Sequence, residues 1–443
     1  MQNLSEGNSL KVILNFTMPM LIGNVFQQLY NVIDSIIVGN FLGKEALSAV
    51  GASFPVMFAL ISLVIGIASG STIIISQYFG AKDFQKVKIA IDTMYVVIFV
   101  ASILISIIGI SFSEDIFRLI ELPETIIPQA KTYLNIILAG IIMMFGSSGT
   151  NAVLRGLGDS KTPLYFLVFA SILNIIFDLL FVLVFKLGIE GVAIATVLSQ
   201  AIAFLSAVVY LNKYHELINI SLTSFKIDKD IFIKSVKIGL PSGLQNMFVA
   251  VGMIAIYRIV NQFDTNVIAA YSVAGRIDSF AIMPAMNFSM ALTVFVGQNI
   301  GAGKMNRVWE GLKATLLLTS IISITFSLIA VFFGKYLMRI FTPDEAVQLI
   351  GYNYLVIVGL FYIIFSAMFS FNAVYRGAGD TIVPMFITLF ALWFIRIPFS
   401  WFLSQKIGET GIWWGIPIAW AFGLTISAFY FASGRWKRKS IIN

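Results

Sequence analysis

The chain contains two copies of one unit. The segment Asn151–Asp159, NAVLRGLGD, returns 221 positions later as Asn372–Asp380, NAVYRGAGD. At the same offset, Gln77 matches Gln298 and Tyr133 matches Tyr354. Pro19 matches Pro241 at an offset of 222. A repeat of about 220 residues is far longer than the repeats of solenoid proteins, so it predicts a duplicated membrane half with a symmetry axis between the copies.

Composition places both copies in a membrane. Apolar residues make up 58% of the chain and charged residues 12%, against about 25% charged residues in soluble domains. Apolar runs long enough to cross a hydrocarbon core recur throughout, for example at 94–111, 165–185, 316–333 and 412–431. We count twelve such runs, six in each copy. Because the runs lack the alternation of barrel strands, they are predicted to be helices, which satisfy their own backbone hydrogen bonds in lipid.

The predicted fold is an all-α membrane protein with twelve transmembrane helices in two six-helix bundles. An even number of spans gives both copies the same orientation, so we expect a pseudo-two-fold axis along the membrane normal. The expected boundaries are an N-terminal bundle at 1–211, a cytoplasmic linker at 212–233 and a C-terminal bundle at 234–443.

Basic residues predict how the chain is oriented. Most of the 29 lysines and arginines fall on one side of the predicted spans, including the 212–233 linker and the tail at 435–439. The protein is predicted to lie in the cell membrane. The positive-inside rule then places both termini in the cytoplasm. The same rule explains the net charge of +7 without a nucleic-acid partner.

Several other classes of site are excluded. The chain has no cysteine and a single histidine, His215, so it has no thiolate or multi-histidine metal site. The segment before the first span has no basic cluster and is not expected to be a cleavable signal peptide.

The repeated turn contains glycines that invite comparison with a phosphate-binding loop. Such a loop needs glycine directly before the lysine, but Ser160 precedes Lys161, and the second copy has Ile382 at the matching position. We therefore interpret both copies of the motif as structural turns in which glycine permits a tight backbone.

Ionisable residues inside a span cost at least a few kcal/mol, which makes each one a functional candidate. Those deepest in the first copy are Asp34 and Asp178. In span one, Asn24, Gln27, Asn31 and Asp34 follow spacings of three and four and so share one helical face. Because a polar stripe cannot face lipid, this face is predicted to contact protein or water.

Four polar groups are expected to converge in the first copy. In span five, Asn174 lies one turn from Asp178, and at about 1.5 Å per residue Asp178 reaches a depth similar to that of Asp34. Thr196 reaches the same level from span six. Two carboxylates in a low-dielectric pocket disfavour joint ionisation, so Asp34 and Asp178 can hold a proton or a sodium ion. The alternative is that these groups only hold neighbouring helices together.

The second copy carries a different set of charges. Arg276, Asp278 and Arg396 all fall near the middle of the membrane, where Asp278 could neutralise one arginine. Arg258 is nearer the outer end of its span and could extend to the interface. At the repeat offset, Asp34 and Asp178 have no acidic counterpart. Ion coupling is therefore predicted in the first copy.

These features resemble the multidrug and toxic compound extrusion (MATE) transporters over the whole chain. The resemblance rests on the duplicated six-span plan, Pro19 and Asp34 in span one, the Asn174 and Asp178 pair, Thr196 and the two Arg-Gly-x-Gly-Asp turns. The set looks like the DinF-like branch, in which the matching positions form a cation-coupling site in the N-terminal lobe. The resemblance implies secondary antiport of organic compounds, mostly cations, against H⁺ or Na⁺ by alternating access, without a cofactor and without enzymatic activity.

Span one is expected to bend during transport, and a cavity beside it is expected to bind the substrate. Pro19 removes a backbone hydrogen bond, so it predicts a bend that protonation of Asp34 or Asp178 would control. Polar, aromatic and methionine side chains would accept varied flat cations. The candidates for substrate binding are Gln27, Tyr30, Asn31, Met57, Met283, Met286, Arg276 and Asp278. We expect a monomer whose partners are small organic cations and the bilayer.

The sequence leaves two alternative functions open. A flippase for lipid-linked oligosaccharide or phospholipid would use cationic groups such as Arg258, Arg276 and Arg396 to hold a phosphate, but the paired aspartates would repel that phosphate. A membrane-embedded enzyme would need a catalytic constellation, which only Asp34 with Asp178 approaches.

Overall fold

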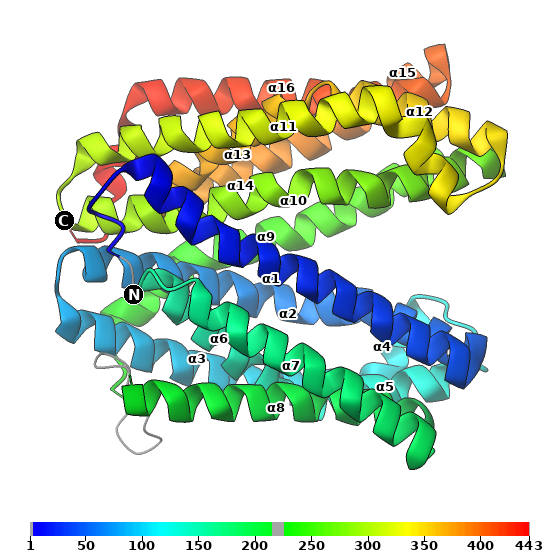
Figure 1. The fold of residues 1–443 in the computed structure, drawn as a ribbon, viewed down its shortest axis with the longest axis horizontal. Helices are drawn as coiled ribbons and strands as arrows, with labels where there is room; N and C mark the ends of the chain where they lie inside the picture. The colour runs from blue at the N-terminus through cyan, green and yellow to red at the C-terminus, as the bar shows by residue number, and fades with distance from the viewer. Residues whose placement is uncertain (1–2, 215–225, 443) are drawn as a thin grey trace. The chain divides into compact units, whose positions relative to one another are not determined.

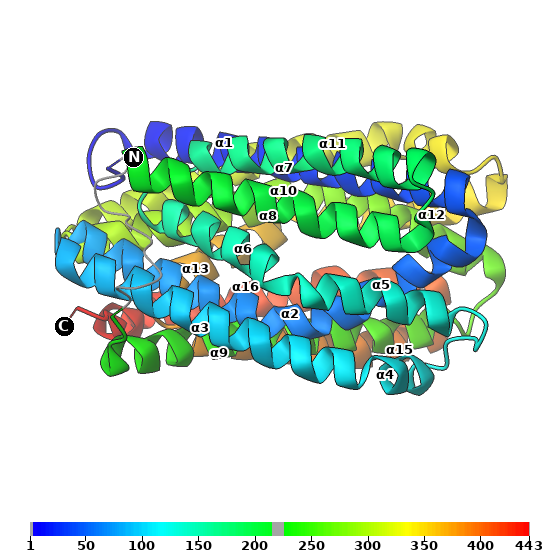
Figure 2. The same ribbon diagram turned by 90° about the horizontal axis from the view of Figure 1, so that it is seen from below.

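The computed structural model describes residues 3–214 and 226–442, and all regular elements in these ranges are helices, as Figures 1 and 2 show. The elements before the linker are α1 (Ser9–Ile37), η1 (Val38–Leu42), α2 (Gly43–Gly80), α3 (Phe84–Ser111), α4 (Ser113–Leu119), α5 (Ile127–Ala139), α6 (Ile141–Gly156), α7 (Lys161–Leu179), η2 (Leu180–Val184) and α8 (Gly188–Tyr214). Those after it are α9 (Lys229–Val260), α10 (Thr265–Gly301), α11 (Met305–Phe341), α12 (Glu345–Gly359), α13 (Tyr362–Gly377), α14 (Ile382–Leu389), η3 (Phe390–Arg396), α15 (Ile397–Ile407), α16 (Glu409–Ser433) and η4 (Arg435–Lys439). His215 and positions 215–225 of the predicted linker lie outside the described residues.

Helix length and hydropathy identify the membrane spans. Within the described residues, nine helical segments are long and apolar enough to cross a membrane, and two bent helix pairs raise the number to eleven. One of the nine, Ser9–Ser62, has 54 residues and contains both α1 and the first part of α2. Because a span needs only about 20 residues, this segment forms two spans. The all-α membrane fold with twelve spans is thereby confirmed.

The chain forms two compact units, which divide it differently from the predicted bundles. Among the described residues, unit 1 contains Met18–Gly243, and unit 2 contains Asn3–Thr17 with the part from Leu244 onward. Helix α1 therefore begins in unit 2 and ends in unit 1, whereas α9 begins in unit 1 and ends in unit 2. Each change lies within a few residues of a helix proline, Pro19 or Pro241. Because these prolines match in the repeat, one helix in each copy begins in one unit and ends in the other.

Each unit is built around one long helix. In unit 1, α2 packs against α3, α5 and α6, and α8 packs against α7, as Figure 2 shows. In unit 2, α10 packs against α11, α12 and α13, which Figure 1 shows running beside it. The core of unit 2 includes the fully buried side chains of Phe288, Phe295 and Trp413.

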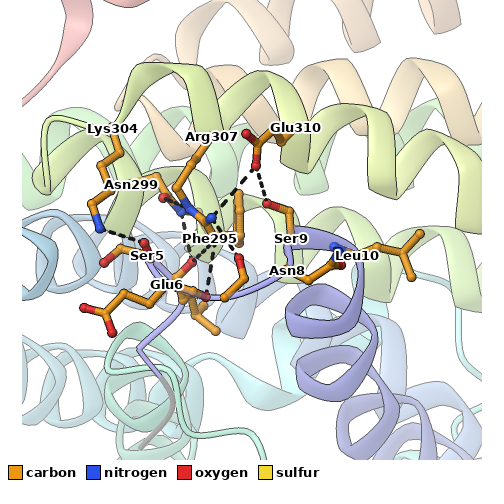
Figure 3. A network of polar contacts seen from close by, with 12 residues as sticks. Ser5, Glu6, Asn8, Ser9, Leu10, Phe295, Asn299, Lys304, Arg307 and Glu310 are labelled. Carbon is orange, nitrogen blue, oxygen red and sulfur yellow. Dashed lines mark hydrogen bonds and ion pairs between the residues drawn. The ribbon is translucent and has the colours of Figure 1, made fainter.

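The N-terminal segment is bound to unit 2 by a network of hydrogen bonds, shown in Figure 3. The Leu4 backbone donates to Gln298 at 3.0 Å, and Asn299 donates to the Leu4 carbonyl at 3.2 Å. Arg307 donates to the carbonyls of Gly7 at 2.9 Å and Glu6 at 3.3 Å. Two further contacts are Lys304 with the Ser5 carbonyl at 2.9 Å and Ser9 with Glu310 at 2.9 Å. These bonds explain why the start of α1 belongs to unit 2.

Replacement of Arg307 is expected to release this segment. Arg307→Ala removes hydrogen bonds from a charged donor to backbone carbonyls, so the segment should lose about 2 kcal/mol of local stability. Hydrogen exchange should then accelerate at residues 3–10, while the core of α10 keeps its protection. Lys313→Ala, which removes a cation resting on Trp309, is the matched control. Equal hydrogen exchange at residues 3–10 in the two variants would show that Arg307 does not hold this segment in unit 2.

The start of α9 joins unit 1 because glycines let its backbone touch that of α2. A Cβ atom at Gly70 would lie 2.7 Å from the Gly239 nitrogen and 2.7 Å from the Ser235 carbonyl oxygen. A Cβ at Gly66 would lie 2.6 Å from the Gly239 oxygen. Glycines four residues apart on facing helices permit such close approach in membranes.

The aspartates of the repeated turns bind the backbone at the start of the helix that follows each turn. Asp159 accepts from the backbone N–H groups of Lys161 and Thr162, each at 3.0 Å, and so caps the start of α7. Asp380 accepts from the Val383 backbone at 3.4 Å and from the Tyr430 hydroxyl at 2.6 Å. The preceding glycines, Gly158 and Gly379, have φ of 83° and 96°, values that glycine adopts without a steric penalty.

Candidate functional site

Helix α1 brings two polar side chains to the interior of unit 1. Tyr30 and Asp34 are one turn apart and so lie on the same face. The helix runs through Pro19 as one element and passes into the π-helical segment η1 after Ile37. A second π-helical segment, η2, begins two residues after Asp178. Single π-helical turns within α-helices are frequent at functional sites, and here one follows each of the predicted acidic residues.

The carboxyl groups of Asp34 and Asp178 are hydrogen-bonded to each other. An ionised carboxylate only accepts hydrogen bonds, so this contact requires one proton shared by the pair. Asp178 is fully buried. The Oδ1 atoms of Asp34 and Asp178 are also buried and have no hydrogen-bond partner within the described ranges. The pair therefore presents two unsatisfied acceptor oxygens in a water-poor interior.

Asn174 and Thr196 complete the predicted group. With its amide oriented to satisfy both atoms, Asn174 donates to Asp178 at 2.8 Å and accepts from the Thr196 backbone at 3.3 Å. Thr196 also forms a side-chain hydrogen bond with Tyr30. The structure thus brings together Asp34, Asn174, Asp178 and Thr196, the four residues that the sequence predicts to converge.

Tyr133 of α5 is a further member of this group that sequence reasoning did not assign to the site. Its side chain is 8% exposed, and it interacts electrostatically with Asp34, Tyr30 and Asp178. The signal that could have found it is its match with Tyr354 in the repeat. We define the acidic site as Tyr30, Asp34, Tyr133, Asn174, Asp178 and Thr196.

The acidic site offers oxygen atoms as ligands. None of the described lysines and arginines is among the groups that act on Asp34 or Asp178. The described residues contain no group of three or more His, Cys, Asp or Glu that could hold a metal ion. A hard cation such as Na⁺ would therefore depend on the two carboxyl groups with hydroxyl and amide oxygens around them. The donor set fits a proton or a single monovalent cation.

The other predicted residues of unit 1 are more exposed than Asp178. Gln27 and Asn31 are exposed, and Asn31 donates to Gln28 at 3.4 Å. Met57 is partly exposed on α2. Of the predicted stripe on α1, Asp34 contacts Asp178.

Unit 2 holds a different acidic residue. Asp278 of α10 is 9% exposed and accepts a hydrogen bond from Tyr354 at 3.3 Å. Of the predicted arginines, Arg396 is the one whose charge acts on Asp278. Arg276 is exposed on the same helix, as is Met286, while Met283 is partly exposed.

The sequence profile of the MatE family matches the chain twice, at residues 19–180 and 241–402. The two matches start 222 positions apart, which agrees with the internal repeat. Together they cover most of the chain and include every residue of the acidic site except Thr196.

Relatives and solved structures resemble the chain over nearly its whole length. The probable multidrug resistance protein YpnP of Bacillus subtilis is 36% identical, with 98% of this chain and 97% of that protein covered. The probable multidrug resistance protein NorM of Thermotoga maritima is 27% identical, with 98% and 94% covered. A crystal structure of MATE in the straight conformation superposes with a TM-score of 0.91 at 24% identity, covering 99% of this chain and 98% of that one. A MATE structure in the bent conformation gives 0.92 over 98% and 97%.

Proposed function

Since the chain belongs to the MatE family of multi-pass membrane transporters, we propose that it is a secondary antiporter that exports organic cations in exchange for protons at the acidic site. Relatives named as multidrug resistance proteins support small-molecule efflux as the general activity. The proposal adds the coupling ion and the residues that bind it. It assigns coupling to Asp34 and Asp178, positioned by Asn174, Thr196 and Tyr30.

The pairing of the Asp34 and Asp178 carboxyl groups in the interior of unit 1 is the observation that carries this proposal. Deprotonation would leave two adjacent negative charges in a low-dielectric interior, which is strongly unfavourable without a compensating cation. An organic cation can supply that compensation, and so can a returning proton. Because both compete for the same two carboxyl groups, binding of one favours release of the other.

Alternating access would follow from the same competition. We propose that protonation of the pair changes how α1 packs within unit 1, and that Pro19 supplies the bend. In unit 1, Gln27, Tyr30, Asn31 and Met57 are proposed to contact substrate, and in unit 2 Met283, Met286, Arg276 and Asp278 have that role. Both termini are proposed to be cytoplasmic, with the chain acting as a monomer.

Transport by purified protein in proteoliposomes tests this function. We expect export of a cationic fluorescent dye when an inward proton gradient is imposed, because protons drive the exchange. An inward sodium gradient at constant pH should give no export above that of protein-free vesicles. The measurement is dye fluorescence, with a protonophore abolishing the response to the proton gradient.

Two other outcomes would replace the proposal. Export driven by the sodium gradient alone would reassign the acidic site to Na⁺. No dye movement under either gradient, together with protein-dependent scrambling of a fluorescent anionic lipid, would indicate a flippase.

A further inference from the structure

A short basic helix follows the last membrane span and is fixed to unit 2. Helix η4, with the sequence RWKRK, comes after α16 and Gly434, whose φ of 67° lets the backbone turn there. Figure 2 shows it in red beside the C-terminus. Trp436 is 2% exposed, its Nε1 donates to the Phe431 carbonyl at 3.2 Å, and its ring stacks on that of Phe431 with centroids 5.4 Å apart. One buried side chain therefore anchors η4 to the end of α16.

The end of η4 lies against the second repeated turn. A Cβ atom at Gly379 would lie 2.9 Å from the Lys439 carbonyl oxygen and 3.3 Å from Cγ1 of Ile441. The aspartate of this turn, Asp380, accepts from the Tyr430 hydroxyl of α16 at 2.6 Å. Contacts at Trp436 and at Lys439 thus hold η4, and its side chains extend from a defined backbone.

Four cationic side chains are exposed on this backbone: Arg435, Lys437, Arg438 and Lys439. Within residues 3–214 and 226–442, none of them forms an ion pair as close as 4 Å. Residues 410–443 contain no Asp or Glu, and Asp380 of the adjacent turn is 4% exposed. Lys437 lies over the Trp436 ring at 5.8 Å, a contact that leaves its charge in place. Because adjacent like charges repel one another, an external anion would stabilise this group.

An aromatic cluster next to η4 marks the level of the membrane interface. Trp309 of α11 stacks on Phe431 with centroids 5.3 Å apart, and Phe371 of α13 meets the same ring edge to face at 5.3 Å. Trp309 is 46% exposed, and Lys313 lies over its ring at 5.1 Å. Both α11 and α16 are long and apolar enough to cross a membrane, and tryptophan is enriched where spans reach the lipid headgroups. The cations of η4 therefore lie beside the headgroup region.

We propose that this region binds the headgroup of an anionic phospholipid. The basic interfacial surface, as we call it, consists of Trp309, Lys313 and the four cations of η4. The cations fit the lipid phosphate, and the exposed ring of Trp309 fits the boundary between headgroup and acyl chains. Basic residues that only orient a chain need no fixed geometry, whereas these are held by the buried Trp436 and by a turn. The proposal depends neither on antiport nor on the coupling ion.

Lipid titrations followed by native mass spectrometry test the proposal on the full chain in detergent. The wild type should bind its first phosphatidylglycerol molecule more tightly than phosphatidylcholine with the same acyl chains. Lys437→Gln/Arg438→Gln should weaken binding of that phosphatidylglycerol at least about five-fold, the effect of one basic residue at an anionic surface. The matched control, Lys82→Gln/Lys88→Gln, removes two exposed cations of unit 1 and should leave the affinity near the wild-type value.

Trp436→Ala separates the position of the cations from their charge. It keeps every cation but removes the side chain that anchors η4, so it should weaken phosphatidylglycerol binding as Lys437→Gln/Arg438→Gln does. Wild-type affinity in either variant, or equal weakening in the control, would overturn the proposal. Displacement of the lipid by millimolar inorganic phosphate would also overturn it, since the ligand would then be a free anion.

If Trp436→Ala yields no folded protein, Lys437→Gln/Arg438→Gln still decides, because it changes only exposed side chains. None of these measurements involves transport, so failure of this surface is distinguishable from failure of the antiport mechanism.

Discussion

Asp178→Asn is expected to abolish proton-driven export while leaving the protein folded. Asparagine keeps the shape of the side chain and can still bond Asn174, but it can neither share a proton with Asp34 nor carry the charge that attracts a cation. Loss of a charged interaction worth about 3 kcal/mol corresponds to a reduction of about 100-fold in rate. The measurement is the initial rate of dye export from proteoliposomes under an inward proton gradient.

Asp34→Asn should give a loss of the same order, because both carboxyl groups belong to one pair. Asp115→Asn is the matched control, since it neutralises an exposed carboxylate of α4 in the same unit. Export by Asp115→Asn should stay near the wild-type rate. Wild-type rates in both Asp34→Asn and Asp178→Asn would show that coupling occurs elsewhere.

Gly70→Val is expected to prevent stable folding of unit 1. Its Cβ would lie 2.7 Å from backbone atoms of both Gly239 and Ser235, and backbone atoms within two packed helices cannot move aside cheaply. Overpacking of this kind costs about 1–3 kcal/mol or more, and here it separates the start of α9 from α2. The yield of monodisperse protein and its melting temperature in detergent should both fall.

Gly51→Val is the control for helix propensity and bulk, because a Cβ at Gly51 on the same helix meets no atom within 4 Å. Gly70→Ala should fall between the wild type and Gly70→Val. If Gly70→Val were as stable as Gly51→Val, close contact between α2 and α9 would not be what holds the start of α9 in unit 1.

The acidic site was largely predictable from the sequence because helices have a regular rise and period. Counting residues from the ends of the spans places Asp34, Asp178 and Thr196 at one level and Asn174 one turn away, and the structure brings the four together. Tyr133 was not predicted, because a tyrosine among apolar residues carries no sign of what its hydroxyl contacts. Its neighbours depend on how α5 packs against α2 and α8, which periodicity does not determine.

The sequence also did not predict that the start of α1 lies in unit 2 and the start of α9 lies in unit 1. The N-terminal segment joins unit 2 through backbone carbonyls that accept from Arg307, and any sequence has such carbonyls. The start of α9 joins unit 1 through Gly66 and Gly70, and glycine has many other uses in membrane helices. The boundaries of the repeat follow the chain, whereas the boundaries of the units follow these contacts.

Competition between a cation and the shared proton is the central claim, and proton release on substrate binding tests it most directly. A cationic dye is added to purified protein in weakly buffered detergent solution, and the change in pH is recorded together with the amount of dye bound. The wild type should release about one proton per bound cation, because the acidic pair shares one proton. Asp178→Asn should release none. Dye binding to the wild type without proton release would contradict the mechanism, and so would equal release from Asp178→Asn.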